Sequence, residues 1–299
     1  PTTFDVRYDA NGGSTTPADA HYTMGTQFSL PTSSTVTKRG YTLVGWNDTT
    51  ANRTGTYTMP AADVAFTAVW DPIDYFVTYH GNGNTSGSAP IDSTGYHVDA
   101  TVTASTPGTL AKTGHTFAGW NTQALGGGTP RAAGAGFSIG AASVDLYAQW
   151  TVNSYDVRYE AGAGTWVTGQ QIADGTQNYN TTLSIVDGTG KVTKPGYTFT
   201  GWTYNSTLYS GSSASLTMPA STVQLVATFS PVSYTVTYQA DGGTWAVGAP
   251  IEGNHIVGDT FAVAASSVVA KDGYTFNGWT DGTSAYASGS TYTVGTSNV

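Results

Sequence analysis

Seven residues, GYTLVGW at 40–46, return three times along the chain with small changes. The copies read GHTFAGW at 114–120, GYTFTGW at 196–202 and GYTFNGW at 273–279. The tryptophans that close them, Trp46, Trp120, Trp202 and Trp279, are 74, 82 and 77 residues apart. This spacing predicts four tandem repeats, at 1–72, 73–152, 153–231 and 232–299. Because each is longer than the roughly 20 to 45 residues of a solenoid unit, we expect each repeat to be a small domain.

The composition indicates a folded, β-rich protein. Charged residues make up 10% of the chain, while 19 Tyr, 10 Phe and 8 Trp recur at intervals that only packing would require. Cysteine is absent, so neither disulfides nor thiolate metal sites are possible. A net charge of −9 with only ten Lys and Arg argues against a nucleic-acid partner.

The chain contains no apolar run near the roughly 18 residues that a membrane-spanning helix needs. No charged-then-apolar leader begins at Pro1. We therefore expect no membrane insertion within this segment, and any export signal or anchor should lie outside it.

Each repeat is expected to hold about five strands. The first alternates strictly, as in FDVRYDANGG at 4–13, and ends in an Asn-Gly or Asp-Gly pair suited to a tight hairpin turn. A second strand around Phe28 and Leu30 should return from that turn. The seven-residue motif is the third strand, YTMP at 57–60 and its counterparts are the fourth, and VAFTAVW at 64–70 and its counterparts are the fifth. The stretch 31–38 and its counterparts could hold one short helical turn.

The third strand raises a question of side-chain direction. In a regular strand Tyr41, Leu43 and Gly45 share one face. Val44 and Trp46 share the other, and the position of Val44 reads Ala, Thr and Asn in the other repeats, which is typical of a solvated site. A β-bulge at the glycine would reverse the parity and bury the indole. We predict the bulge, because the same Gly-Trp pair closes every copy; the alternative is four exposed indole platforms.

The residues predicted to build the four cores are the ring, glycine and tryptophan of each motif and the aromatic that ends each fifth strand. They are Tyr41, Gly45, Trp46 and Trp70; His115, Gly119, Trp120 and Trp150; Tyr197, Gly201, Trp202 and Phe229; and Tyr274, Gly278 and Trp279. Large aromatic rings suit domains of this size, because each buries about 150 to 250 Å².

The order of these elements resembles the Listeria-Bacteroides repeat, also called the internalin-B B-repeat. The features that carry the resemblance are Tyr-x-Val-x-Tyr, Asn-Gly-Gly, Lys-x-Gly-Tyr-Thr-Phe-x-Gly-Trp and Leu-x-Ala-x-Trp, and they cover the whole chain as four tandem copies. The resemblance implies a compact β-grasp-like unit of bacterial cell-surface and secreted proteins, where tandem copies act as stalks or adhesive modules. It supplies no catalytic residues. The third repeat departs from the pattern: EAGAGTW at 160–166 replaces the Asn-Gly-Gly turn, and we expect a longer hairpin there.

Reactive side chains form no recurring catalytic or metal site. The five histidines lack ligand spacing, and no Ser, His and acid recur together. A lysine stands two residues before each motif, at Lys38, Lys112, Lys194 and Lys271. These lysines suggest either a Lys-Asn isopeptide crosslink or a cation over an aromatic ring. We favour the ring, because the candidate Asn47 and Asn121 have no counterpart in the last two repeats. We expect no enzyme activity, metal or cofactor.

The last residue, Val299, aligns with Val64, where the fifth strand of the first repeat begins. The fourth repeat therefore lacks its last strand in this sequence. Two explanations are open. The array continues, which is the simpler one, or a neighbouring chain donates the strand at an open edge.

The sequence as a whole predicts a non-enzymatic stalk or adhesin segment of a bacterial cell-surface or secreted protein. We expect an elongated rod of four domains that spaces an adhesive tip from the envelope or builds an extracellular fibre. Its expected partners are other repeats of the same chain or neighbouring protomers, and a host or environmental glycan or protein.

The alternative function is a carbohydrate-binding repeat array, which needs exposed aromatic rings. The candidates are Trp166 and Trp245, at a turn-proximal position that only two repeats fill with tryptophan. The competing interpretation, which we favour, is that these two indoles cap a hydrophobic edge.

Overall fold

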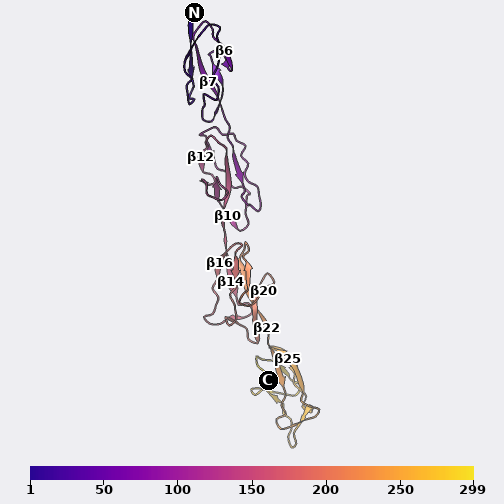
Figure 1. Ribbon diagram of the computed structural model, residues 1–299. Coiled ribbons are helices and arrows are strands. Elements are labelled where there is room, and N and C mark those ends of the chain that lie inside the picture. Colours follow the sequence, from indigo (N-terminus) through magenta and orange to yellow (C-terminus); the bar gives the residue numbers. More distant parts are fainter. The chain divides into compact units, whose positions relative to one another are not determined.

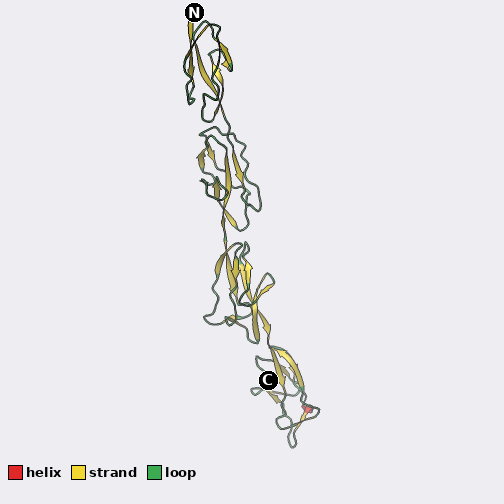
Figure 2. Cartoon of the chain, in the orientation of Figure 1, coloured by secondary structure: helices red, strands yellow, loops and turns green.

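The computed structural model describes residues 1–299, and its regular secondary structure consists almost entirely of strands, joined by turns and loops (Figure 2). The chain divides into two compact units, Pro1–Val152 and Asn153–Val299. Each unit contains two separate hydrophobic clusters, one for each predicted repeat. One 3-10 turn, η1 (Ser266–Val268), lies in the fourth repeat at the counterpart of the stretch 31–38.

Short strands surround each cluster (Figure 1). In the first repeat they are β1 (Thr3–Asp9), β2 (Ala20–Thr23), β3 (Gln27–Ser29), β4 (Tyr41–Asn47), β5 (Asn52–Arg53), β6 (Thr56–Thr58) and β7 (Val64–Pro72). In the second they are β8 (Val77–His80), β9 (Thr101–Thr103), β10 (His115–Asn121), β11 (Pro130–Arg131), β12 (Gly136–Ser138) and β13 (Val144–Val152). In the third they are β14 (Ser154–Glu160), β15 (Thr165–Trp166), β16 (Gly175–Asn178), β17 (Thr182–Ser184), β18 (Val192–Thr193), β19 (Tyr197–Tyr204), β20 (Thr207–Tyr209), β21 (Ser215–Thr217) and β22 (Val223–Pro231). In the fourth they are β23 (Ser233–Thr237), β24 (Thr244–Trp245), β25 (Ile251–Ile256), β26 (Thr260–Ala262), β27 (Val269–Ala270), β28 (Trp279–Thr280), β29 (Ala285–Tyr286) and β30 (Thr291–Thr293).

The last long strand of a repeat lies at the centre of its main sheet. In the first repeat the order is β2-β1-β7-β4-β5, and the third repeat has the same order, β16-β14-β22-β19-β20. The strand β7 runs parallel to β1, with Val6 opposite Val64, and antiparallel to β4. Alternate residues Val64, Phe66 and Ala68 of β7 are buried. In the first three repeats this central strand therefore joins the first strand to the motif strand.

The predicted second strand was wrong in its pairing. The partner of β1 is β2, whereas Phe28 lies in β3, which pairs with β6 in a separate two-stranded sheet. A turn at Gly25 (φ +79) separates β2 from β3, and the Phe28 ring stacks on Tyr22 with centroids 4.3 Å apart. Two short strands, β2 and β3, thus occupy the segment where one strand was expected, and the repeats hold more than five strands.

The Asn-Gly turns adopt the predicted backbone but do not close tight hairpins. Asn11 and Gly12 have φ of +48 and +79, as a turn with two left-handed residues requires. Ten residues, 10–19, nevertheless separate β1 from β2, and fourteen, 161–174, separate β14 from β16 in the third repeat. The turn instead faces the central strand: the Asn11 side-chain amide donates to the Ala68 carbonyl at 3.0 Å.

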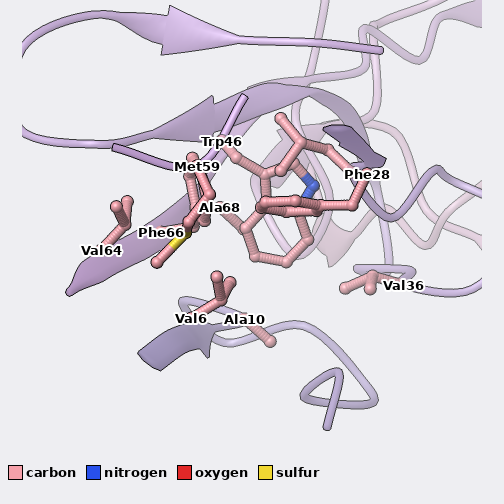
Figure 3. Packing of buried hydrophobic residues seen from close by; sticks show 10 residues of the cluster. Val6, Ala10, Phe28, Val36, Trp46, Met59, Val64, Phe66 and Ala68 are labelled. Carbon is pink, nitrogen blue, oxygen red and sulfur yellow. The ribbon is translucent and has the colours of Figure 1, made fainter. Parts of the chain in front are cut away.

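The predicted bulge is confirmed in the first three repeats. Leu43 pairs with Trp70 and Gly45 with Val69, so Val44 is the extra residue. The same register shift occurs at Phe117/Gly119 and Phe199/Gly201. Val44 is 43% exposed and Trp46 only 1%. Figure 3 shows the Trp46 indole inside the cluster, among Phe28, Phe66 and Met59.

The fourth repeat differs, because its motif does not form the seven-residue strand that we predicted. Only Trp279 and Thr280 are in a strand, β28, which pairs with β29. Tyr274 is 73% exposed. The motif strands of the other repeats pair along their length with the central strand, and here that strand is represented by Val299 alone.

We predict that Trp202→Ala destabilises the third repeat by about 3 to 5 kcal/mol, because it removes a large ring from a closed core. Native-state hydrogen exchange, resolved by repeat, would measure this loss directly. Leu208→Ala is the control: Leu208 is 49% exposed in the same repeat and its truncation should cost under about 1 kcal/mol. Equal losses for the two variants would contradict burial of the indole.

Candidate functional site

The motif tryptophan meets the last tyrosine of the first strand in every repeat. The two rings are edge-to-face, with centroids 4.6 to 5.1 Å apart. Aromatic pairs of this geometry contribute about 0.5 to 1.5 kcal/mol beyond their burial. The pairs are Tyr8–Trp46, Tyr79–Trp120, Tyr159–Trp202 and Tyr238–Trp279.

Each indole N–H is occupied by a backbone carbonyl of its own repeat. The acceptors are the carbonyl oxygens of Pro31, Ser105, Val186 and Ala264, at 2.7 to 2.8 Å. In the last three repeats the N–H of that same residue donates to the tyrosine hydroxyl, as Ser105 does to Tyr79 at 2.8 Å. One residue is thereby held between the tyrosine and the tryptophan. We call this arrangement the Tyr-Trp clamp.

The clamp of the first repeat lacks one of its bonds. Pro31 stands where the other repeats have Ser, Val or Ala, and proline has no N–H to donate. Burial, with a smaller contribution from the nearby Tyr22, raises the pKa of Tyr8 to about 12. Burial also raises the pKa of Tyr159, but there the hydrogen bond from the Val186 N–H opposes the rise.

Aromatic residues of the central strands cover the turns that follow the first strands. A Cβ built on Gly13 would lie 2.9 Å from the Trp70 ring, and one on Gly164 would lie 2.5 Å from the Phe229 ring. The Trp70 indole donates to the Ala10 carbonyl at 3.0 Å, and Trp150 does the same to Gly81 at 3.1 Å. These rings, like the motif tryptophans, therefore pack within their own repeats.

The lysines of the first, third and fourth motifs lie over the motif tyrosine rings. The Lys38 ammonium is 4.5 Å from the centroid of Tyr41, and Lys194 is 3.6 Å from that of Tyr197. The Lys38 Nζ also donates to the backbone carbonyl of Asn11 at 3.2 Å. The shallow hollow that holds Lys38 and Asn47 contains no carboxylate, which an isopeptide bond would need. The contacts favour the cation-over-ring interpretation.

Trp166 and Trp245, the candidate ligand contacts, are partly buried. The Trp166 ring lies 5.9 Å from that of Trp202, and the Trp245 ring stacks 6.0 Å from that of Trp279 at an interplanar angle of 16°. Each therefore lies against the indole of a Tyr-Trp clamp. This position suits the interpretation that they cap a hydrophobic edge.

The sequence interpretation missed the polar residues that follow the motif. Asp48 is buried; its carboxylate accepts hydrogen bonds from Thr50 and the Ala51 N–H and pairs with Arg53 at 2.8 Å. The Thr50 hydroxyl foremost, with those other donors, holds the pKa of Asp48 below its usual range. Asp281 occupies the same place in the fourth repeat and binds its own loop in the same way. The shared spacing after the tryptophan was the available signal. These carboxylates order loops.

A groove of about 880 Å³ lies in the fourth repeat, and Val236, Phe276, Trp279 and Val299 are among the residues that line it. The Val299 N–H donates to the Thr235 carbonyl, and its own carbonyl accepts from Thr237 at 2.7 Å, which reproduces the parallel pairing of Val6 with Val64. The groove is the place that β7, β13 and β22 fill in the other repeats.

No group of three or more His, Asp or Glu side chains is placed to hold a metal ion. The structure contains no helix of the length and hydropathy that crossing a bilayer requires.

These observations define a class: a chain of small, similar β domains that use their large aromatic side chains in their own cores. Within that class, the chain belongs to the Listeria-Bacteroides repeat domain family, whose model matches residues 4–69, 75–149 and 234–299. The divergent InlB B-repeat domain matches 155–233, the repeat whose Asn-Gly-Gly turn is altered. The predicted family and its four tandem copies are confirmed. The family carries no catalytic implication and is typical of bacterial surface proteins.

Two relatives come from Evansella cellulosilytica. A "Putative Gly-rich membrane protein" is 28% identical over 278 residues, which is 88% of this chain and 30% of that protein. A "Putative membrane protein" is 31% identical over 155 residues, 50% of this chain and 23% of that protein. The chain thus spans under a third of the length of either relative. No solved structure matches it.

We predict that Pro31→Ala lowers the pKa of Tyr8 from about 12, because the new N–H can donate to the tyrosine oxygen. Because the pKa of Tyr8 is higher in the folded than in the unfolded chain, it contributes stability below a pH of about 10, and this contribution is lost as the pH rises toward the folded-state pKa. The variant, with the smaller pKa shift, should therefore lose less folding free energy at high pH. At neutral pH the added hydrogen bond, about 1 kcal/mol, and the lost proline rigidity, about 0.4 to 1 kcal/mol, nearly cancel. Tyrosine-labelled NMR titration measures the shift. Tyr8→Phe, which removes the group, is the control; an unmoved pKa would exclude the missing bond as its cause.

We further predict that a peptide with the sequence of β22, VQLVATFSP, binds the groove of the fourth repeat. It offers one backbone edge to β23 and the other to the motif segment 274–278, and alternate apolar side chains to the floor. Hydrogen exchange should show protection at 233–237 and 274–278. A peptide carrying Leu225→Asp, which would bury a charge at a fully buried position, should protect neither segment. Equal protection by both peptides would show that the contact is non-specific.

Proposed function

We propose that this chain is a non-enzymatic stalk or adhesin segment of a bacterial cell-surface or secreted protein. The observation that carries the proposal is the Tyr-Trp clamp. Each motif tryptophan packs within its own repeat and its indole N–H is bonded there, so the recurring sequence is used for structure. The family's occurrence in surface proteins and the membrane-protein names of the two relatives support the location.

The proposed shape is a rod of four β-grasp-like domains. The sheet order of the first and third repeats, with a central strand parallel to the first strand, supports the β-grasp-like description. The linkers between the strands of neighbouring repeats are short, with four residues at 73–76 and one residue each at Asn153 and Val232, and prolines at 72 and 231 end two of the central strands. Short, proline-stiffened linkers favour an extended array. Such a rod would space an adhesive tip from the envelope or contribute to an extracellular fibre.

The proposed partners are further repeats, neighbouring protomers, or a glycan or protein reached by the tip. Carbohydrate binding by the repeats is the alternative function, and the partial exposure of Trp166 and Trp245 is the feature that supports it. The two functions differ in a simple way. A spacer needs no ligand, whereas a sugar receptor must respond to one through these two indoles.

We predict that small-angle scattering gives a radius of gyration of roughly 35 Å, the value for a rod of about 120 Å, instead of the roughly 19 Å of one compact domain of this length. Intrinsic fluorescence should not respond to a panel of polysaccharides. A saturable response that Trp166→Ala and Trp245→Ala together abolish would favour the carbohydrate receptor. A compact scattering profile would contradict the rod.

A further inference from the structure

The first glycine of the motif meets the following repeat within each compact unit. Gly40 has a φ of +78, and a Cβ built on it would lie 2.5 Å from the Cβ of Val98 in the second repeat. Gly196 has the same relation to Val257 of the fourth repeat, at 2.5 Å from its Cγ1. Real carbon atoms do not approach so closely without displacement. Only a glycine therefore leaves room for the valine at these two contacts between neighbouring repeats, which we call joints.

Backbone hydrogen bonds hold the glycine side of each joint. The linker that leaves the central strand returns to the glycine: the Ile73 N–H donates to the Gly40 carbonyl, and the Val232 N–H donates to the Gly196 carbonyl, both at 2.9 Å. The glycine and the start of the next repeat are thus fixed to each other on one side of the valine.

Backbone hydrogen bonds also hold the valine side. Val98 precedes Asp99, whose φ is +66 and whose N–H donates to the Ile139 carbonyl at 2.8 Å. Val257 precedes Gly258, whose φ is +88 and whose N–H donates to Val294 at 2.9 Å. Each valine is therefore presented by a turn that is anchored in its own repeat, so the contact can transmit orientation from one domain to the next.

The fourth repeat distinguishes two reasons for a glycine at this position, its positive φ and the close approach of a neighbouring side chain. Gly273 has a φ of +76, and the N–H of Tyr274 donates to the Lys271 carbonyl at 3.0 Å, just as Tyr41 does to Lys38. No atom lies within 4 Å of a Cβ built there. The left-handed conformation therefore belongs to the motif itself, whereas the close approach belongs to the joint.

We propose that the first glycine of the motif is the docking surface for the following repeat. The partner it fits is a turn that carries a branched apolar side chain one residue before a residue of positive φ. This inference rests on the proposed spacer function and deepens it, because seated joints would limit bending between neighbouring domains, which otherwise move freely across small interfaces. The Arg39–Asp99 ion pair at the first joint adds little, since both side chains are more than half exposed.

Paired spin labels test the proposal in the full chain. Cysteine is absent, so Ala61→Cys and Leu125→Cys place one label on each of the first two repeats at exposed positions. We expect a narrow distance distribution in the labelled parent and a distribution about twofold broader after Gly40→Ala. Gly25→Ala is the matched control in the first repeat, because Gly25 has a φ of +79 and no atom lies within 4 Å of a Cβ built there, so it imposes the same left-handed strain without a neighbour and should leave the distribution unchanged.

A second variant removes the valine without adding strain. Val98→Ala should also broaden the distribution, although less than Gly40→Ala, while hydrogen exchange within both repeats stays at the parent level. A distribution that remains narrow in both Gly40→Ala and Val98→Ala overturns the proposal. The distance between the labels reports only the joint between the first two repeats. A compact scattering profile would therefore refute the spacer function without changing the label result, and a broad label distribution in the parent would refute the joint without deciding the function.

Discussion

The Tyr-Trp clamp is the constraint on which each repeat depends. An indole N–H or a tyrosine hydroxyl left without a partner inside a small core costs about 1 to 3 kcal/mol. In the last three repeats both polar atoms bond to one stretch of backbone, and the two rings pack edge to face. The clamp therefore fixes three chain segments at once: the first strand, the segment after β3 or its counterpart, and the motif.

The bulge follows from the clamp. Strand parity alone would send Trp46 to the same side as Val44, which is 43% exposed, and the extra residue at the bulge removes that conflict. The same reasoning explains why Gly119 and Gly201, with φ of +125 and +149, precede the buried indoles. In the fourth repeat Gly278 keeps a φ of +136 and Trp279 still donates to Ala264, although the strand around them is missing. The indole thus takes its place independently of the ladder.

For function, the consequence is that the aromatic and charged side chains that stand out in the sequence stabilise the fold. The motif tryptophans, the lysines over rings and the carboxylates of Asp48 and Asp281 all have partners inside their own repeats. The surfaces through which a repeat can contact its neighbours are its joint and its strand edge. A protein built this way can be lengthened by adding modules, since each module completes its own core. That property suits the spacing role expected of a surface protein.

The sequence by itself determined the repeat number and the family and, in the first three repeats, the central strand and the burial of the motif tryptophan. These follow from periodic patterns and from the parity argument at Gly45, both of which act over a few neighbouring residues. Only the tertiary structure decided the rest. It assigned Phe28 to a separate small sheet, it turned Asn11 toward Ala68, and it gave Gly40 a neighbour that Gly273 lacks. It also left 274–278 outside any strand, although GYTFNGW differs little from GYTFTGW. The physical reason is the same in each case: strand pairing and close approach depend on which distant segment is present to share hydrogen bonds and contacts, and local sequence does not encode that partner.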